Sequence, residues 1–164
     1  MEDVLGFNRN KFIGIEKIDD NTIRVFGTLE DNLYAHEIEF EFDLNELKIL
    51  KIKGHMRRFT TPLCPPAAEL LQKAVGMKLE LGITSKIKRE ISRPGCRHFG
   101  NLLNECLNSI IPAILSNEWR KVKEENPEMT RTEFFKYISE KIPIVSDYCA
   151  IFSEKSPIKS NPSE

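Results

Sequence analysis

A strict alternation of side chains between Leu33 and Asp43 constrains the fold more than any other feature of the sequence. Successive side chains of a β-strand point to opposite faces of a sheet, so every second residue shares a face. One face of this segment is largely apolar (Tyr34, His36, Ile38, Phe40 and Phe42), and the other is mainly acidic (Ala35, Glu37, Glu39 and Glu41). This pattern is typical of an antiparallel strand with one buried and one solvated face.

Neighbouring segments complete a predicted antiparallel sheet. Three further strands are predicted at residues 12–18, 22–29 and 47–53, and the second of these is rich in β-branched and aromatic side chains. Clusters of turn-forming residues separate the strands, at 19–21, 30–32 and 43–46. Connections this short join consecutive strands in an antiparallel meander.

After this sheet the pattern changes from the period of a strand to that of a helix. Residues 64–76 are predicted to be helical, because Pro65 and Pro66 suit a first turn and Gly76 suits a helix end. Residues 77–91 are ambiguous. Their alternation between Leu79 and Ser85 also allows a fifth strand at the edge of the sheet.

A long apolar stripe at helical spacing begins at His98. Pro112 lies inside the stripe and predicts a kink or break near residues 108–109, because proline removes a helical hydrogen bond. Thr130–Glu133 fits a capping box, which predicts a further helix over 133–141.

These elements predict an α+β fold, in which an antiparallel meander of four or five strands is followed by helices packed on one face. A chain of 164 residues suits one domain with its own core. We expect that domain to span residues 1–154 and the polar, proline-bearing residues 155–164 to form a disordered tail.

Composition excludes several classes of partner. The formal net charge is −1, which gives no general attraction to nucleic acid or to an anionic membrane. The basic runs at 56–58 and 86–89 are interpreted as solvated strand edges. No signal peptide is visible, and no segment has the roughly 20 apolar residues of a membrane helix. We therefore expect a cytoplasmic protein with reduced thiols.

Four residues are predicted to meet at one end of the sheet and form a metal site. The direction of the meander places Asp31 and Cys64 on neighbouring connections, and the returning chain brings Cys96 and His98 to the same end. Thiolate, imidazole and carboxylate together suit zinc or an iron–sulfur species. A helix N-terminus also favours a thiolate, and Gly95 would allow a sharp turn beside Cys96.

The other cysteines and histidines are interpreted as structural. Cys106 and Cys149 lie in apolar segments, where free cysteine usually packs. His36 is read as a core or sheet-edge histidine, five residues and roughly 16 Å along the chain from Asp31. His55 is expected to be solvated. Packing is also the alternative interpretation of Cys64 and Cys96.

Two short motifs resemble those of a known family. Pro62-Leu63-Cys64-Pro65-Pro66-Ala67 and Gly95-Cys96-Arg97-His98 resemble an uncharacterised bacterial and archaeal family, a domain of unknown function with P-x-C-P-x-A and G-C-x-H motifs. The resemblance covers roughly residues 10 to 125. It brings no established activity.

The order of elements is more distantly similar to the IscU/NifU/SufU iron–sulfur scaffold proteins. In this resemblance Cys64 matches the second cysteine of the family, Cys96 with His98 matches the third, and Asp31 matches the aspartate of the first loop. The first cysteine has no counterpart, since Glu30 and Asp31 occupy its turn. The resemblance implies a zinc or iron–sulfur cofactor and a sulfur-transfer or iron–sulfur assembly partner.

Three functions are therefore open from the sequence. The first is a metal- or cluster-binding protein related to the scaffolds. The second is an enzyme, in which Cys64 or Cys96 is a nucleophile with His98 as base, or in which a metal with an open position activates water. The third is a metal-free interaction module whose cysteines only pack.

Overall fold

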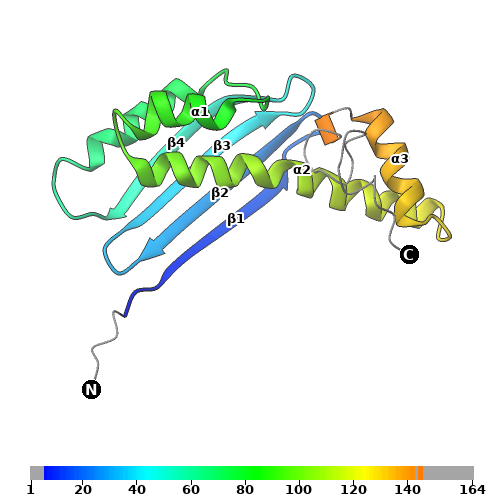
Figure 1. Cartoon of the computed structure of the whole chain (residues 1–164), viewed down its shortest axis with the longest axis horizontal. Helices are drawn as coiled ribbons and strands as arrows, with labels where there is room; N and C mark the ends of the chain where they lie inside the picture. The colour runs from blue at the N-terminus through cyan, green and yellow to red at the C-terminus, as the bar shows by residue number, and fades with distance from the viewer. Residues whose placement is uncertain (1–5, 143, 146–164) are drawn as a thin grey trace, which may run out of the picture. The chain divides into compact units, whose positions relative to one another are not determined.

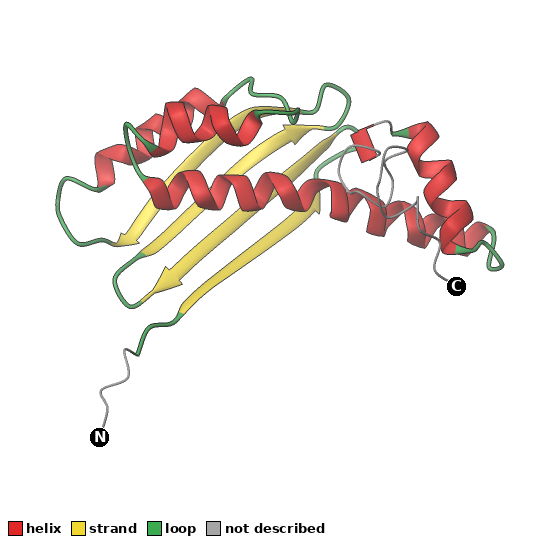
Figure 2. Ribbon diagram, in the orientation of Figure 1, coloured by secondary structure: helices red, strands yellow, loops and turns green. Residues whose placement is uncertain are grey.

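The computed structural model describes residues 6–142 and 144–145, and it contains one sheet followed by helices (Figures 1 and 2). In chain order the elements are β1 (Arg9–Lys17), β2 (Thr22–Asp31), β3 (Ala35–Asp43), β4 (Lys48–Arg58), the 3₁₀ helix η1 (Pro65–Ala74), α1 (Ile83–Ile87), the π-helix η2 (Lys88–Ser92), α2 (Arg97–Glu125) and α3 (Arg131–Lys141). The chain divides into two compact units between Ser109 and Ile110. Each unit is described by itself.

The sheet is the predicted meander. Its strands are ordered β1-β2-β3-β4, and each neighbouring pair is antiparallel. The register aligns a row of apolar residues across all four strands, in which Ile15 pairs with Val25, Val25 with Phe40, and Phe40 with Ile52. The predicted α+β class, with helices after an antiparallel sheet, is confirmed.

Residues 77–91, for which the sequence allowed a fifth strand, do not form a strand of the sheet. Leu81 is 87% exposed whereas Leu79 is buried, so the alternating leucines do not share a buried face. Gly82 then adopts the left-handed conformation, with φ of 91°, and α1 begins directly after it. The basic run at 86–89 accordingly lies on α1 and η2, and its interpretation as a strand edge is wrong.

Two glycines let helices approach the buried face of the sheet closely. A Cβ atom on Gly27 of β2 would lie 2.5 Å from Cys106 Sγ of α2. A Cβ atom on Gly54 of β4 would lie 2.3 Å from Leu71 Cδ1 of η1. Both distances are shorter than van der Waals contact, so the absence of a side chain at these positions sets the spacing between the layers.

The opposite face of the sheet carries a ladder of charges. Arg24 of β2 pairs with Glu16 of β1 at 2.7 Å, and Lys51 of β4 pairs with Glu41 of β3 at 2.8 Å. Arg24 also lies 3.8 Å from Glu41, so this carboxylate is flanked by cations from both neighbouring strands. Cross-strand pairs of opposite charge stabilise a solvated sheet face. They explain the acidic half of the alternation in β3.

The helix predicted over residues 64–76 is present, whereas the prediction for the later helix needs correction. The segment after Cys64 is a 3₁₀ helix rather than an α-helix, with Cys64 at its N-cap position. Of the kink or break expected near residues 108–109, the break is wrong, since α2 is helical without interruption from Arg97 to Glu125 and contains Pro112, and the kink stays a prediction. Proline removes one backbone donor, and the surrounding hydrogen bonds of a 29-residue helix are enough to continue it.

The second unit contains the end of α2 and α3. The predicted capping box is confirmed: Thr130 Oγ1 accepts from the Glu133 amide, and the Glu133 carboxylate accepts from the Thr130 amide at 2.8 Å. Trp119 packs edge-on against Phe134, with ring centroids 5.0 Å apart.

No helix in the described part of the chain has the length and apolar character needed to cross a membrane. A single domain over 1–154 stays a prediction, and the tail at 155–164 lies outside the described residues.

Candidate metal centre

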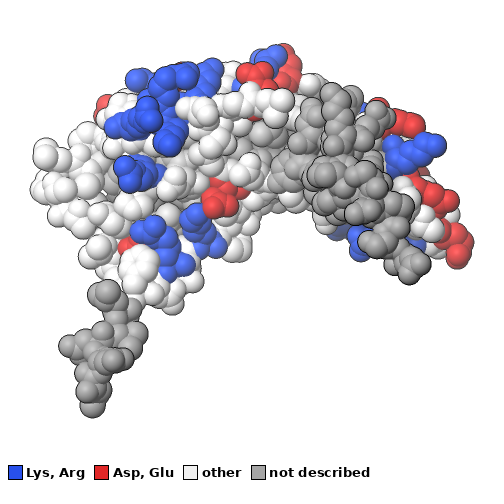
Figure 3. All heavy atoms as spheres, viewed as in Figure 1, with Lys and Arg blue, Asp and Glu red and all other residues white. Residues whose placement is uncertain are grey.

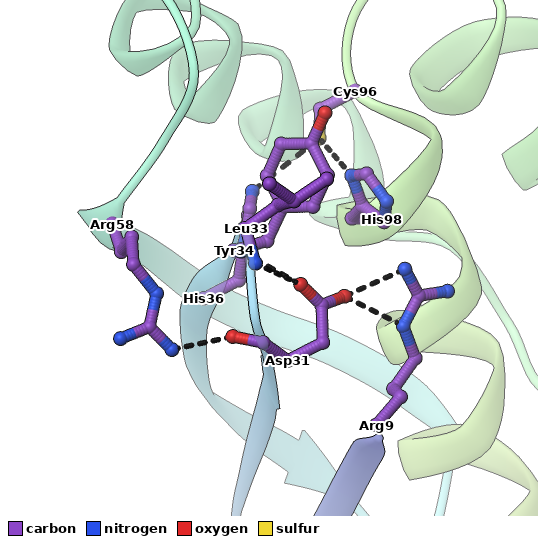
Figure 4. Close-up of polar contacts among 8 residues, drawn as sticks. All are labelled: Arg9, Asp31, Leu33, Tyr34, His36, Arg58, Cys96 and His98. Carbon is purple, nitrogen blue, oxygen red and sulfur yellow. Dashed lines mark hydrogen bonds and ion pairs between the residues drawn. The ribbon is translucent and has the colours of Figure 1, made fainter. Parts of the chain in front are cut away.

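A cluster of two histidines and one cysteine forms where the sheet meets the start of α2 (Figure 4). His36 is the second residue of β3 and lies on the buried face of the sheet. Cys96 immediately precedes α2, and its carbonyl oxygen accepts the Gly100 amide at 3.1 Å. His98 lies in the first turn of α2. The cluster therefore joins two segments that are far apart in the sequence.

The ligand atoms of the cluster are close enough to bind one metal ion. Cys96 Sγ lies 3.7 Å from His36 Nε2 and 4.0 Å from His98 Nδ1. One ligand atom from each of the three residues lies within 4.8 Å of the other two. Tetrahedral zinc, with Zn–S near 2.3 Å and Zn–N near 2.0–2.1 Å, places sulfur and nitrogen about 3.6 Å apart. Movements of a few tenths of an ångström would bring the two sulfur–nitrogen distances to that value.

Aromatic packing fixes the orientation of both imidazoles. The Tyr34 ring lies over His98, with ring centroids 4.1 Å apart, and the Phe99 ring meets His36 edge-on at 5.0 Å. His36 is only 1% exposed. A preorganised set of ligands loses less conformational entropy when an ion binds.

Both imidazoles are held in the neutral form. Burial, and after it the electrostatic effect of the neighbouring His98, lower the pKa of His36 to about 4. Burial and then the Arg9 charge lower the pKa of His98. A neutral imidazole offers a lone pair to a metal ion, whereas a protonated one cannot. His36 Nδ1 has no hydrogen-bond partner within the described part of the chain.

Asp31 lies close to the cluster, but both oxygens of its carboxylate already accept hydrogen bonds from other residues. Arg9 donates to Oδ2 from two nitrogens, at 2.8 and 2.6 Å, and the Leu33 and Tyr34 amides donate to Oδ1 at 2.7 and 2.8 Å (Figure 4). Burial would raise the pKa of Asp31, but these donors outweigh it and hold the pKa below its usual value. Asp31 fixes the turn between β2 and β3 and so sets the start of the strand that carries His36.

The structure does not bring Cys64 into the three-residue group. Cys64 caps η1 and is partly exposed, and its amide donates to the Thr61 carbonyl at 2.9 Å. Cys64 and Asp31 as metal ligands stay predictions. Gly95 does not adopt the left-handed backbone conformation. It instead allows Leu70 to pack closely against the backbone, because a Cβ atom at this position would lie 2.4 Å from Leu70 Cδ1.

His36 is the member of the cluster that the sequence analysis missed. The distance of roughly 16 Å from Asp31 assumed that the chain was extended from residue 31 onward. That assumption is wrong, because the Asp31 amide donates to the Tyr34 carbonyl in a tight turn, and His36 pairs with Leu29 on the adjacent strand. The turn cluster at 30–32 was the available signal.

Comparison with known proteins gives a family but no activity. A family model described as "Protein of unknown function (DUF2889)" matches residues 16–111, which is more than half of the chain and includes the whole cluster. No curated protein and no solved structure matches the chain. The resemblance to iron–sulfur scaffold proteins stays a prediction.

Proposed function

The chain belongs to the DUF2889 family, whose description assigns no activity, and we propose from the site itself that the protein binds one transition-metal ion through His36, Cys96 and His98. The observation that carries this proposal is the convergence of one thiol and two neutral imidazoles from two separate elements. Their ligand atoms lie within 4.8 Å of one another.

The ligand types favour zinc. A mixture of imidazole and thiolate is suited to zinc and to iron, and a zinc ion with three protein ligands keeps a fourth position for water or another ligand. A [2Fe–2S] cluster takes four protein ligands, at least two of which are thiolates in the common types. Cys96 is the single thiol in the group. The site therefore supports a mononuclear ion better than a cluster.

The protonation states support binding near neutral pH. His36, with a pKa of about 4, does not need to lose a proton before it can bind a metal. Burial also lowers the pKa of His98. Ligation through Cys96 uses the thiolate form of its side chain.

A nucleophilic cysteine is the second candidate, because the contact between Cys96 Sγ and His36 Nε2 also fits a thiol and its base. General bases work best when their pKa lies near the working pH. His36 has a pKa of about 4 and is therefore a weak base for a thiol at neutral pH. This difference favours the metal function over a nucleophilic Cys96 that uses His36 as its base.

The test is elemental analysis and zinc titration of the purified full-length protein, prepared without a polyhistidine tag. We expect about one zinc per chain, and a loss of binding in His36→Ala, Cys96→Ser and His98→Ala. Loss of a ligand should weaken affinity by more than the roughly 10–100-fold typical of second-shell changes.

Two matched controls sharpen this test. Cys64→Ser removes a partly exposed thiol outside the group, and His55→Ala removes an exposed histidine on β4. Both should bind zinc as the wild type does, and circular dichroism of each variant should confirm folding. The proposal is wrong if the wild type binds no stoichiometric metal, or if His36→Ala binds normally while Cys64→Ser does not.

A further inference from the structure

A second polar site lies beside the start of α2, in the part of the chain with the basic run. A groove of about 610 Å³ is bordered by α1 and η2 on one side and by α2 on the other. Three cationic side chains line it, from Lys88, Arg93 and Arg97. Figure 3 shows Lys and Arg side chains gathered over α1 and the start of α2 on this face.

Helical spacing builds both walls of the groove. Thr84, Lys88 and Ser92 are four residues apart and share one face of α1 and η2. Arg97, Asn101 and Asn104 follow one another at spacings of four and three residues, so they share one face of α2. The walls meet where a Cβ atom on Gly100 would lie 1.8 Å from Ser92 Oγ, so a glycine at that position lets the helices approach.

The described residues do not neutralise the charges in the groove. Among them, no carboxylate side chain lines it. Within the described part of the chain, Lys88, Arg93 and Arg97 have no ion pair and no side-chain hydrogen bond, whereas the adjacent Arg89 pairs with Glu90 at 2.9 Å. Like charges held together raise the local positive potential and favour an anionic ligand.

We propose that this groove binds the phosphate group of a small, polar phosphorylated molecule. Arg93 and Arg97 offer planar pairs of donors that match phosphate oxygens, and Lys88 adds a compact charge. The Ser92 hydroxyl and the Asn101 amide supply neutral hydrogen bonds to the same ligand. The volume lies within the roughly 300–1,000 Å³ of small-molecule sites.

The lining also decides against a nucleic acid as the occupant. Single-stranded nucleic acids are bound by cationic grooves that add aromatic side chains for base stacking. No aromatic residue among those that the structure describes lines this groove. The groove is distinct from the metal cluster, since none of its lining residues belongs to the His36, Cys96 and His98 group, although Arg97 lies between two of them in sequence. The two proposals can therefore fail separately.

The test is calorimetric titration of the full-length protein with inorganic phosphate and with pyrophosphate at fixed ionic strength. We expect saturable binding of pyrophosphate at one site per chain. Lys88→Gln and Arg93→Gln should each weaken it about tenfold, which corresponds to the loss of one charge-assisted contact. The matched control is Arg89→Gln, which removes a neighbouring charge outside the groove and should bind within about twofold of wild type. Zinc binding should be unchanged in all three variants.

Three results would overturn this proposal. The first is no saturable binding of either anion. The second is an equal loss in Arg89→Gln and Lys88→Gln, which would indicate diffuse surface charge rather than a built site. The third is tighter binding of a single-stranded RNA 12-mer that depends on the same residues, which would make the groove a nucleic-acid surface.

Discussion

His36 Nε2 lies 3.7 Å from Cys96 Sγ, although the two residues are 60 positions apart in the sequence. The contact joins the buried face of β3 to the residue that precedes α2. It brings a neutral imidazole and a thiol together in a site that aromatic rings hold in place. The proposed metal function depends on this relationship more than on any sequence motif.

Cysteine reactivity should separate the three described cysteines. Burial raises the pKa of the Cys106 thiol to about 12, so Cys106 should not react with iodoacetamide in the native protein at pH 8. Cys64 and Cys96 are partly exposed and should react in metal-free protein. Zinc should protect Cys96 and leave the labelling rate of Cys64 unchanged. Peptide-resolved mass spectrometry measures each rate, and equal protection of Cys64 would make it a ligand.

Asp31 should contribute to stability at neutral pH and lose that contribution in acid. Its folded-state pKa is lowered from 3.8, so the stabilisation is complete above that value and disappears as pH falls through the folded-state pKa. Asp31→Asn keeps the shape and removes the charge that Arg9 binds. We expect a loss of about 1–3 kcal/mol in the free energy of unfolding at pH 7.

Urea unfolding between pH 7 and pH 2.5 measures this effect. The difference between wild type and Asp31→Asn should shrink as the pH falls below 3.8. Asp20→Asn changes a carboxylate that is 92% exposed and pairs with Lys17, and it should cost no more than about 0.5 kcal/mol. A constant difference between wild type and Asp31→Asn at all pH values would contradict the assigned role.

Gly27 should be needed for close packing of α2 on the sheet. An added Cβ atom would lie 2.5 Å from Cys106 Sγ, so Gly27→Ala should destabilise the protein by about 1–3 kcal/mol. Cys106→Ala removes the sulfur that the new atom meets. In that background Gly27→Ala should cost less, by a coupling of about 0.5 kcal/mol or more. Additive effects in the double-mutant cycle would show that the contact does not limit the spacing.

Local patterns predicted the sheet well and the segment after it poorly. The alternation from residue 33 to 43 identified both faces of β3, because a strand's period and its burial depend on the same geometry. The alternation of Leu79, Leu81 and Ile83 had the same form but made no strand. A left-handed Gly82 ends the alternation there, and a single glycine in sequence does not reveal its φ angle.

The candidate site was only partly predictable. Cys96 and His98 are two residues apart at the start of a helix, so their proximity is visible in the sequence. His36 joins them through a hairpin register, which depends on where the turn at Asp31 begins. A histidine on an apolar strand face can also simply pack in the core. Only the packing of β3 against α2 distinguishes the two roles.

X-ray absorption spectroscopy of the zinc-loaded protein tests the central claim most directly. The spectrum should show one sulfur neighbour at about 2.3 Å and two imidazole nitrogens at about 2.0–2.1 Å, with a fourth light atom. Cys96→Ser should remove the sulfur signal, and Cys64→Ser should leave it unchanged. Two sulfur neighbours, or none, in the wild-type protein would contradict a centre formed by His36, Cys96 and His98.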